Sequence, residues 1–307
     1  MDILVLDPDA PVYSAGIAEA LPDLVVHTDP GAASGAEVVV GLAQAIDAEL
    51  VAALPRLRFI QALTAGTDPL DALTLPPGIA IASARGIHGP QMAEMAFLHM
   101  LTLARDFPAM QANQTRHRWV RWPQRLLLGK TVVLLGLGAI AEALAARCQA
   151  FGMRVVGVSD GRRAAPGCDA VLPRTALAEA AAMADFLIVL VPLAPATERL
   201  VDAGVLAAMK PGGVLINLAR GRVVDEAALI AGLAAGRPAA AGLDVFESEP
   251  LPASSPLWDM PNVVITPHVG GMSDCYARQA LPLVIDNLRG WQRSGPVGLR
   301  NLVRITP

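Results

Sequence analysis

Short apolar runs rich in Val, Ile and Leu alternate with longer segments of helical spacing along most of the chain. Such runs predict strands that are buried on both faces, which is typical of parallel sheets covered by helices. The first series of predicted strands comprises residues 3–6, 24–26, 38–42, 58–63 and 79–83. The second series comprises residues 131–136, 154–158, 186–191, 213–218, 240–245 and 263–266. Two series of this kind predict two α/β domains, each with a doubly wound parallel sheet.

Two long helical segments suggest how these domains are joined. Residues 90–106 predict a single helix between the two strand series, and residues 274–293 predict a helix after the second series. The last helix could return the chain to the first domain and make it discontinuous. We therefore expect one domain from residues 1–98 completed by 283–307, and a second domain from residues 99–282. A length of 307 residues suits two domains of roughly 150 residues each.

Composition narrows the class of protein. A net charge of −4 and a pI near 5.7 provide no basic surface for nucleic acid. Three cysteines without a CxxC pair favour a reduced, cytoplasmic protein. The N-terminus lacks the pattern of a signal peptide, and no apolar run reaches the roughly 18 residues that a membrane span needs. Neither nucleic acid nor a membrane is therefore expected as a partner.

A glycine-rich turn connects a predicted strand to a predicted helix in "TVVLLGLGAIAEALA". Gly136, Gly138 and Ala141 occupy the three small positions of the dinucleotide-binding fingerprint. The first allows a tight turn, the second lets a pyrophosphate approach the backbone, and the third allows the helix to pack on the strand. Because the motif lies between a strand and a helix, it predicts a bound dinucleotide at the helix N-terminus.

The next predicted strand ends in "SDGRR", where a dinucleotide site often has an acid that binds the ribose hydroxyls. Ser159 occupies that position, and Asp160 follows it. A serine with Arg162 and Arg163 nearby suits the 2′-phosphate of NADP, whereas Asp160 suits NAD. A solvated charged turn explains the two arginines equally well, so the choice between NAD and NADP stays open.

Three predicted strands of the second series end in residues with complementary chemistry. Arg220, Glu249 and His268 follow three of these strands, and ligands of open parallel sheets bind beyond the carboxyl ends of the strands. Arginine matches a carboxylate, histidine exchanges protons near neutral pH, and a glutamate beside it stabilises the imidazolium. With hydride from a nicotinamide, these groups suffice to interconvert a 2-keto acid and a 2-hydroxy acid.

The motifs together resemble those of the D-isomer-specific 2-hydroxyacid dehydrogenases. The resemblance is carried by the glycine-rich segment, by "LVPLAPATERLVDAGVLAAMKPGGVLINLARGRVVDEAAL", "AGLDVFESEPLP" and "NVVITPHVGG", and by "IQALTAGTDPLD" near residue 60. It implies a Rossmann nucleotide-binding domain, a flavodoxin-like substrate domain and an NAD- or NADP-dependent oxidoreductase. Glyoxylate, hydroxypyruvate or phenylpyruvate is the type of substrate that it implies.

The resemblance also implies roles for single residues. His268 would be the acid/base, Glu249 its partner and Arg220 the clamp on the substrate. His268 and the backbone of a loop would also contact the substrate, the loop residues being Leu63, Thr64, Ala65 and Gly66. Further residues would line the cofactor site, namely Ala139, Ile140, Pro192, Leu218, Ala219, Asp244, Gly270 and Gly271. Family members are usually homodimers joined through the nucleotide domain, and segment 101–128 would be the contact arm.

The sequence departs from the commonest pattern of the family at three places. Ala141 in place of a third glycine is permitted by the fingerprint. Ser159 leaves the choice between NAD and NADP open, and "AGTD" makes the identity of the substrate less certain.

His99 on the connecting helix is interpreted as structural, and no metal site is expected because Glu249, His268 and Cys275 lack the spacing of metal ligands. A non-enzymatic regulator that senses nicotinamide on the same fold is the alternative function.

Overall fold

The computed structural model describes all residues 1–307, and they divide into two compact units. Unit 1 comprises Met1–Ile87 and Ser273–Pro307, and unit 2 comprises His88–Met272. The sequence analysis expected one domain of residues 1–98 and 283–307 and another of residues 99–282. Both expected boundaries lie about ten residues further along the chain than the boundaries in the structure. The difference arises because the connecting helix α4 (Gly89–Arg105) packs its apolar side into a core of unit 2.

Unit 1 is built on a six-stranded sheet in the order β13-β5-β4-β3-β1-β2. Strands β2, β1, β3, β4 and β5 are parallel and follow the flavodoxin-like order, whereas β13 is antiparallel at the edge. The strands are β1 (Asp2–Leu6), β2 (Val25–His27), β3 (Val38–Gly41), β4 (Phe59–Ala62), β5 (Ala80–Ala82) and β13 (Leu302–Ile305).

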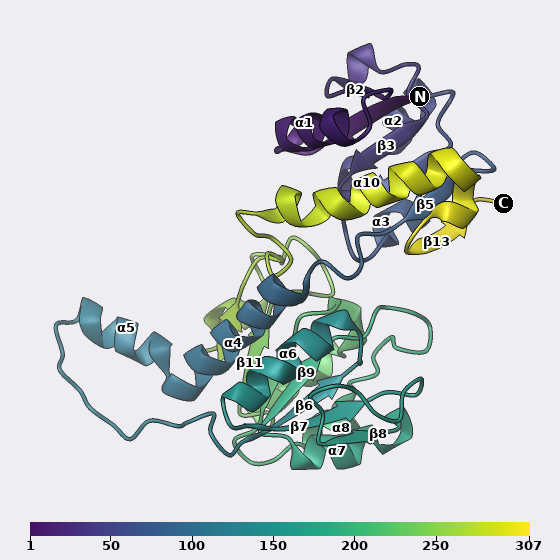
Figure 1. The fold of residues 1–307 in the computed structure, drawn as a ribbon. Coiled ribbons are helices and arrows are strands. Elements are labelled where there is room, and N and C mark those ends of the chain that lie inside the picture. The colour runs from purple at the N-terminus through teal and green to yellow at the C-terminus, as the bar shows by residue number, and fades with distance from the viewer. The chain divides into compact units, whose positions relative to one another are not determined.

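Helices cover both faces of this sheet. Ile3 and Val5 share one core with α1 and α10, whereas Leu4 shares the other core with α2 and α3, as the alternation of a strand requires. Figure 1 shows α10, in yellow, beside α1, in purple, although they lie far apart in the sequence. The helices are α1 (Ala10–Ala20), η1 (Pro30–Ala32), η2 (Ala43–Ala45), α2 (Ala48–Ala53), α3 (Asp68–Asp71), α10 (Tyr276–Ser294) and η6 (Gly295–Gly298).

Unit 2 is built on a seven-stranded, fully parallel sheet in the order β12-β11-β10-β9-β6-β7-β8. This order runs outward from β6 in both directions, as in a Rossmann domain, so the turn after β6 lies where the strand order reverses. The strands are β6 (Thr131–Leu135), β7 (Arg154–Val158), β8 (Ala170–Leu172), β9 (Phe186–Val189), β10 (Val214–Asn217), β11 (Ala240–Leu243) and β12 (Val263–Ile265).

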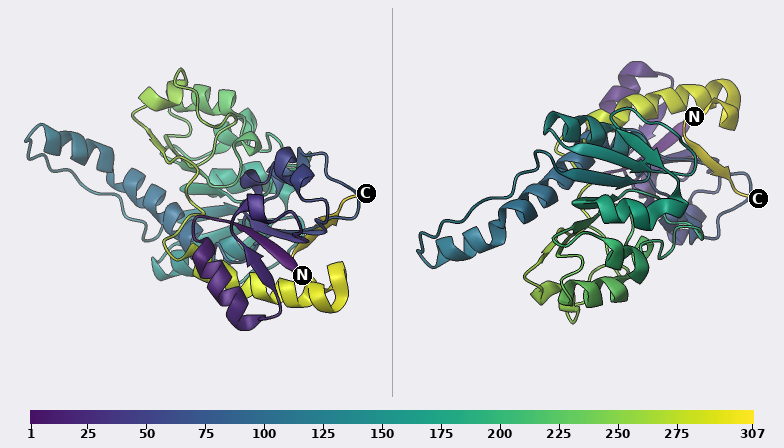
Figure 2. Two further views of the ribbon diagram at one scale, coloured as in Figure 1. Left: turned by 90° about the horizontal axis from the view of Figure 1, so that it is seen from above. Right: turned by 90° about the horizontal axis from the view of Figure 1, so that it is seen from below.

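Two cores flank this sheet as well. Val133 and Leu135 of β6 share one core with helices α7, α8 and α9, whereas Val132 and Leu134 share the other with α4 and α6. The remaining helices of unit 2 are α5 (Phe107–Thr115), α6 (Ala139–Ala150), η3 (Arg174–Ala176), α7 (Leu177–Met183), α8 (Ala203–Ala208), η4 (Gly221–Val223), α9 (Glu226–Ala234) and η5 (Pro256–Asp259). Figures 1 and 2 show α5 projecting from the body of unit 2.

The expected fold class, two doubly wound α/β domains, is confirmed. The sequence interpretation missed strands β8 and β13 and helix α5. None of the helices combines the length and the apolar character that crossing a bilayer requires. The structure thus places the carboxyl ends of β10, β11 and β12, three neighbouring parallel strands, at one edge of the unit 2 sheet.

Candidate active site

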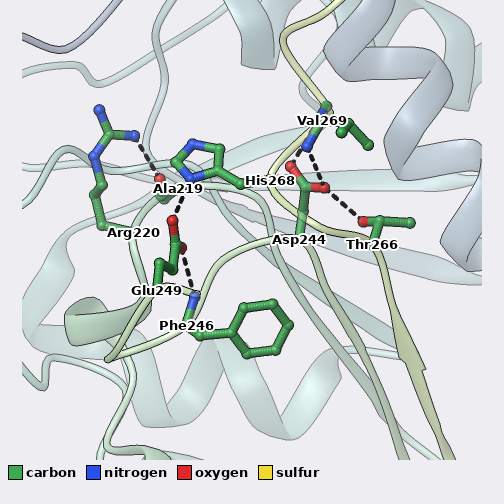
Figure 3. Close-up of polar contacts among 9 residues, drawn as sticks. Ala219, Arg220, Asp244, Phe246, Glu249, Thr266, His268 and Val269 are labelled. Carbon is green, nitrogen blue, oxygen red and sulfur yellow. Dashed lines mark hydrogen bonds and ion pairs between the residues drawn. The ribbon is translucent and has the colours of Figure 1, made fainter. Parts of the chain in front are cut away.

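Arg220, Glu249 and His268 come together at this edge of unit 2. Arg220 lies three residues after β10, Glu249 lies in the segment that follows β11, and His268 lies three residues after β12. Figure 3 shows the imidazole of His268 beside the guanidinium of Arg220 and next to the carboxylate of Glu249. The parallel register of the three strands brings these distant parts of the sequence to one place.

His268 and Glu249 form a short hydrogen-bonded pair. The distance from Nδ1 of His268 to Oε2 of Glu249 is 2.6 Å, and Oε1 accepts a hydrogen bond from the backbone N–H of Phe246 at 2.9 Å. The hydrogen bond that Nδ1 of His268 donates to Glu249 raises the pKa of His268 above its ordinary value, although partial burial acts against it. Burial acts to raise the pKa of Glu249, but the bonds from His268 and Phe246 outweigh it, so that this pKa is lowered. The pair therefore favours imidazolium beside carboxylate.

The turn that carries Arg220 is fixed by a buried asparagine that the sequence interpretation missed. Asn217 is the last residue of β10 and only 1% exposed. Its Nδ2 donates to the carbonyl of Arg220 at 3.0 Å, and its Oδ1 accepts from the N–H of Ala219 at 3.1 Å. The Nη1 of Arg220 donates to the carbonyl of Ala219 at 2.7 Å. A buried asparagine at the end of an apolar strand was the available signal, since such groups need hydrogen-bond partners.

A buried carboxylate organises the loop that carries His268. Asp244, at the end of β11 and 1% exposed, accepts hydrogen bonds from the backbone N–H groups of Val269 at 3.1 Å and Gly270 at 2.9 Å. It also accepts one from Oγ1 of Thr266 at 2.6 Å, and its carbonyl accepts one from the N–H of His268 at 2.8 Å. His268 has a left-handed φ of 53°, which is uncommon for a residue with a side chain. These bonds hold that conformation in place.

The turn between β6 and α6 fits the pyrophosphate of a dinucleotide. Gly136 has a φ of 103°, and a Cβ there would lie 2.9 Å from Val191. A Cβ on Gly138 would meet nothing within 4 Å, so the backbone faces open space at the start of α6. No side chain caps α6, which begins at Ala139 and Ile140. Its first N–H groups can therefore bind a phosphate.

The four residues of the predicted cofactor-selecting turn differ in the partners that they bind. Ser159 directly follows β7, while the carboxylate of Asp160 binds Arg174, a residue that the sequence interpretation missed. Arg174 contributes both its backbone N–H and its guanidinium to this contact, at 2.9 and 2.7 Å. Arg162 pairs with Glu142 at 2.5 Å, whereas Arg163 is exposed and makes no hydrogen bond or ion pair. Asp160 and Arg162 are thus engaged by protein groups.

The remaining predicted residues lie in two different places. Leu218 and Ala219 are buried directly after β10, and the carbonyl of Pro192 accepts a hydrogen bond from Thr197 at 2.6 Å in the loop after β9. Gly271 closes the His268 loop at the end of unit 2. The predicted substrate loop, Leu63, Thr64, Ala65 and Gly66, belongs to unit 1. It is ordered there by a bond from Thr64 Oγ1 to the carbonyl of Gly66 at 2.6 Å and by Tyr276, which donates to the carbonyl of Leu63.

Metal ligands are not grouped in this chain. No set of three or more His, Cys, Asp or Glu side chains in residues 1–307 is placed to hold a metal ion. Cys275 belongs to unit 1, whereas His268 and Glu249 belong to unit 2 and bind each other.

Comparisons with known proteins identify the family of this chain. The family model described as "D-isomer specific 2-hydroxyacid dehydrogenase, NAD binding domain" matches residues 97–270. A D-3-phosphoglycerate dehydrogenase of Mycobacterium tuberculosis is 38% identical over 240 residues, which are 76% of this chain and 44% of the relative. The chain thus spans less than half the length of that relative. A glyoxylate reductase of Korarchaeum cryptofilum is 32% identical over 276 residues, covering 87% of this chain and 83% of the relative.

Solved structures match the whole chain. A D-isomer specific 2-hydroxyacid dehydrogenase family protein from Aeromonas salmonicida has a TM-score of 0.90 and 31% identity, covering 99% of this chain and 98% of its own. One from Xanthobacter autotrophicus, in complex with NADPH and MES, has a TM-score of 0.84 and 31% identity with the same coverage. The family model alone covers more than half of the chain. The chain belongs to the D-isomer specific 2-hydroxyacid dehydrogenase family.

Proposed function

We propose that this protein is an NAD- or NADP-dependent oxidoreductase that interconverts a small 2-keto acid and the D-2-hydroxy acid. The observation that carries the proposal is the His268–Glu249 pair at 2.6 Å beside Arg220, at the ligand edge of a nucleotide-binding sheet. Family membership and the NADPH complex of a relative support it. Glyoxylate or hydroxypyruvate is the proposed type of substrate, because a relative that is matched over most of its length is a glyoxylate reductase.

His268 acts as the acid in the proposed reduction. Its Nδ1 is bound to Glu249, so Nε2 is the atom that gives a proton to the keto oxygen. A bound nicotinamide supplies the hydride to the carbonyl carbon. The keto acid, NAD(P)H and one proton become the hydroxy acid and NAD(P)⁺, and the proton returns to Nε2 in the reverse direction. The ionised Glu249 stabilises the imidazolium that begins the reduction.

Arg220 provides the positive charge for the substrate carboxylate in this proposal. Its guanidinium is planar and offers paired N–H donors that match the two oxygens of a carboxylate. The bond from Nη1 to the carbonyl of Ala219 limits the orientations of the group. The backbone of Leu63 to Gly66 is proposed as a second binding element for the same carboxylate.

Both cofactors are proposed to work, with at most a slight preference for NADPH. No acid occupies the Ser159 position, and Asp160 is neutralised by Arg174, so a 2′-phosphate would meet little negative charge there. Arg163 is exposed and available as a cation. Arg162 offers less support than the sequence suggested, because Glu142 and the carbonyl of Leu137 already bind it.

The arm of unit 2 is proposed to join two copies into a homodimer. Exposed apolar side chains are concentrated in residues 107–128, where Trp119 is 92% exposed and Leu128 is 66% exposed. Phe107, Val120 and Leu126 add to this surface. Several exposed large apolar side chains within one short segment support an interface there. A cytoplasmic location is proposed as well, on the ground that the three cysteines are unpaired.

A panel of 2-keto acids, each assayed with NADH and with NADPH, tests this function. Reduction of glyoxylate or hydroxypyruvate to the D-hydroxy acid is the expected result. Tight binding of NADPH without turnover of any keto acid would contradict the proposal and favour the nicotinamide-sensing regulator. Chiral analysis of the product separates the D- from the L-isomer.

A further inference from the structure

A fully buried histidine lies under the His268 loop, within unit 2. His99 is on α4, its exposed fraction is 0%, and α4 packs against β11 and β12. A Cβ built on Gly242 of β11 would lie 2.6 Å from Nδ1 of His99, so the ring rests against bare backbone. Its Nε2 lies 3.2 Å from Oγ1 of Thr266, two residues before His268. A packing role alone does not require this polar contact.

The direction of the hydrogen bonds can be assigned. Both carboxylate oxygens of Asp244 accept hydrogen bonds from backbone N–H groups, as an ionised carboxylate does. An ionised carboxylate has no proton to give, so in the 2.6 Å contact Thr266 donates its single hydroxyl proton to Asp244. Thr266 must then accept from His99, whose Nε2 carries a proton. Burial lowers the pKa of His99 to about 4, so the ring is neutral and Nδ1 is unprotonated. Nδ1 makes no hydrogen bond, in agreement with this tautomer.

We propose that His99 is a positioning residue for the His268 loop (His268, Val269 and Gly270), acting through Thr266 and Asp244. The Nε2–H of His99 holds the Thr266 hydroxyl toward Asp244. Asp244 in turn holds the backbone of His268, Val269 and Gly270. The role rests on the proposed function, because it gives this loop its catalytic meaning. His99 touches neither substrate nor cofactor in this proposal.

Amide hydrogen exchange in the cofactor-free protein tests the chain of bonds directly. His99→Leu removes the donor, and His99→Gln replaces it with an amide N–H at a similar reach. Met100→Leu is the matched control, because Met100 is also 0% exposed and on the same helix. In His99→Leu, the Val269 and Gly270 amides should exchange roughly 2- to 10-fold faster, the factor expected for one neutral hydrogen bond. The Ile216 amide in β10 should not change, and His99→Gln should restore slow exchange.

Steady-state kinetics provide the second measurement. His99→Leu should lower kcat by a similar factor at a temperature well below its melting point, while Met100→Leu keeps the wild-type kcat. Thr266→Val removes the same hydrogen-bonded link. The double variant, His99→Leu with Thr266→Val, should therefore lose no more kcat than either single variant. If His99→Leu does not fold, His99→Gln and Thr266→Val carry the test, with slow exchange expected in the first and fast exchange in the second.

Several outcomes would overturn the positioning role. Unchanged exchange of Val269 and Gly270 in Thr266→Val, or additive effects in the double variant, would show that His99 only fills space. Equal losses in His99→Gln and His99→Leu would show the same. The amide-exchange measurement needs no turnover, so it tests the positioning role even if the wild type reduces no 2-keto acid. Absence of turnover would contradict the proposed function and not the hydrogen-bonded link.

Discussion

His268 combines an uncommon backbone conformation with a side chain that is held by a single partner. Its left-handed φ turns the imidazole back toward Glu249, and the bonds from Asp244 to the loop stabilise that conformation. We expect His268→Ala to lower kcat by roughly 10²–10⁴-fold, the usual contribution of general acid–base catalysis. Binding of NADPH, measured by fluorescence titration, should stay within a few fold of wild type. A folded variant with near-normal kcat at pH 7 would refute the assignment.

Glu249 is expected to set the pH range over which His268 can donate its proton. The proposed reduction needs protonated His268, so its rate should fall as pH rises through the raised pKa of His268. Glu249→Gln removes the main cause of that increase, and the limb of the pH–kcat profile should move to lower pH. A profile that stays in place would mean that Glu249 acts only on the structure of the loop. Oxidation of the hydroxy acid, which needs neutral His268, should extend to lower pH in the same variant.

Arg220 should not be replaceable by lysine. The ammonium group keeps the charge but cannot copy the planar pair of donors. Hydrogen bonds to charged groups contribute about 1.5–3 kcal/mol, so Arg220→Lys should lose roughly 10- to 100-fold in kcat/KM. The amide of the same 2-keto acid provides the control, since wild type should discriminate against it and the variant should discriminate less. Equal use of acid and amide by wild type would rule out a carboxylate clamp.

At the scale of elements, the turn after β7 is constrained by the residue that begins η3. The backbone N–H and the guanidinium of Arg174 both bind the carboxylate of Asp160. The guanidinium also donates to the carbonyl of Ala196 at 3.2 Å. Arg174→Ala removes the guanidinium contact and keeps the backbone bond, so Oδ2 of Asp160 becomes available to bind ribose hydroxyls and to repel a 2′-phosphate, which should lower the ratio of NADPH to NADH efficiency. Asp160→Ala should raise that ratio, with an effect that shrinks in high salt because exposed charges are screened. Arg56→Ala, which breaks an exposed pair in unit 1, is the control.

The elements also show how far the sequence could be interpreted. Buried strands such as β6 and β10 were predicted because each contains an unbroken apolar run that ends close to a turn motif. Strands β8 and β13 were missed because they are short edge strands of partly exposed residues. Strand ends and residue types indicated Arg220, Glu249 and His268, and the structure brings them together. Thr266 and Arg174 were not indicated, because their significance depends on partners that only the tertiary fold provides, whereas the polar Asn217 at the end of an apolar strand was a signal that the interpretation did not use.

At the scale of the whole molecule, the arm determines the expected oligomeric state. Replacing Trp119, Val120, Leu126 and Leu128 with serine should convert a dimer into a monomer, because it removes the exposed apolar surface that an interface would bury. Sedimentation velocity at several protein concentrations measures this change. A variant with serine at Val25, an exposed valine of unit 1, should stay dimeric. Wild type that sediments as a monomer at all concentrations would contradict the proposed interface.

The interrupted path of the chain through unit 1 has a consequence for synthesis. The ribosome makes residues 1–87 first, but their core also needs Ala280, Leu288 and Trp291 of α10, and β5 pairs with β13. Unit 2 is continuous, so all of its residues leave the ribosome before α10 does. We therefore expect unit 2, the middle part of the polypeptide, to fold first, while residues 1–87 wait with apolar surface exposed. Nascent chains of this protein should be most vulnerable to proteases and most dependent on chaperones during that interval.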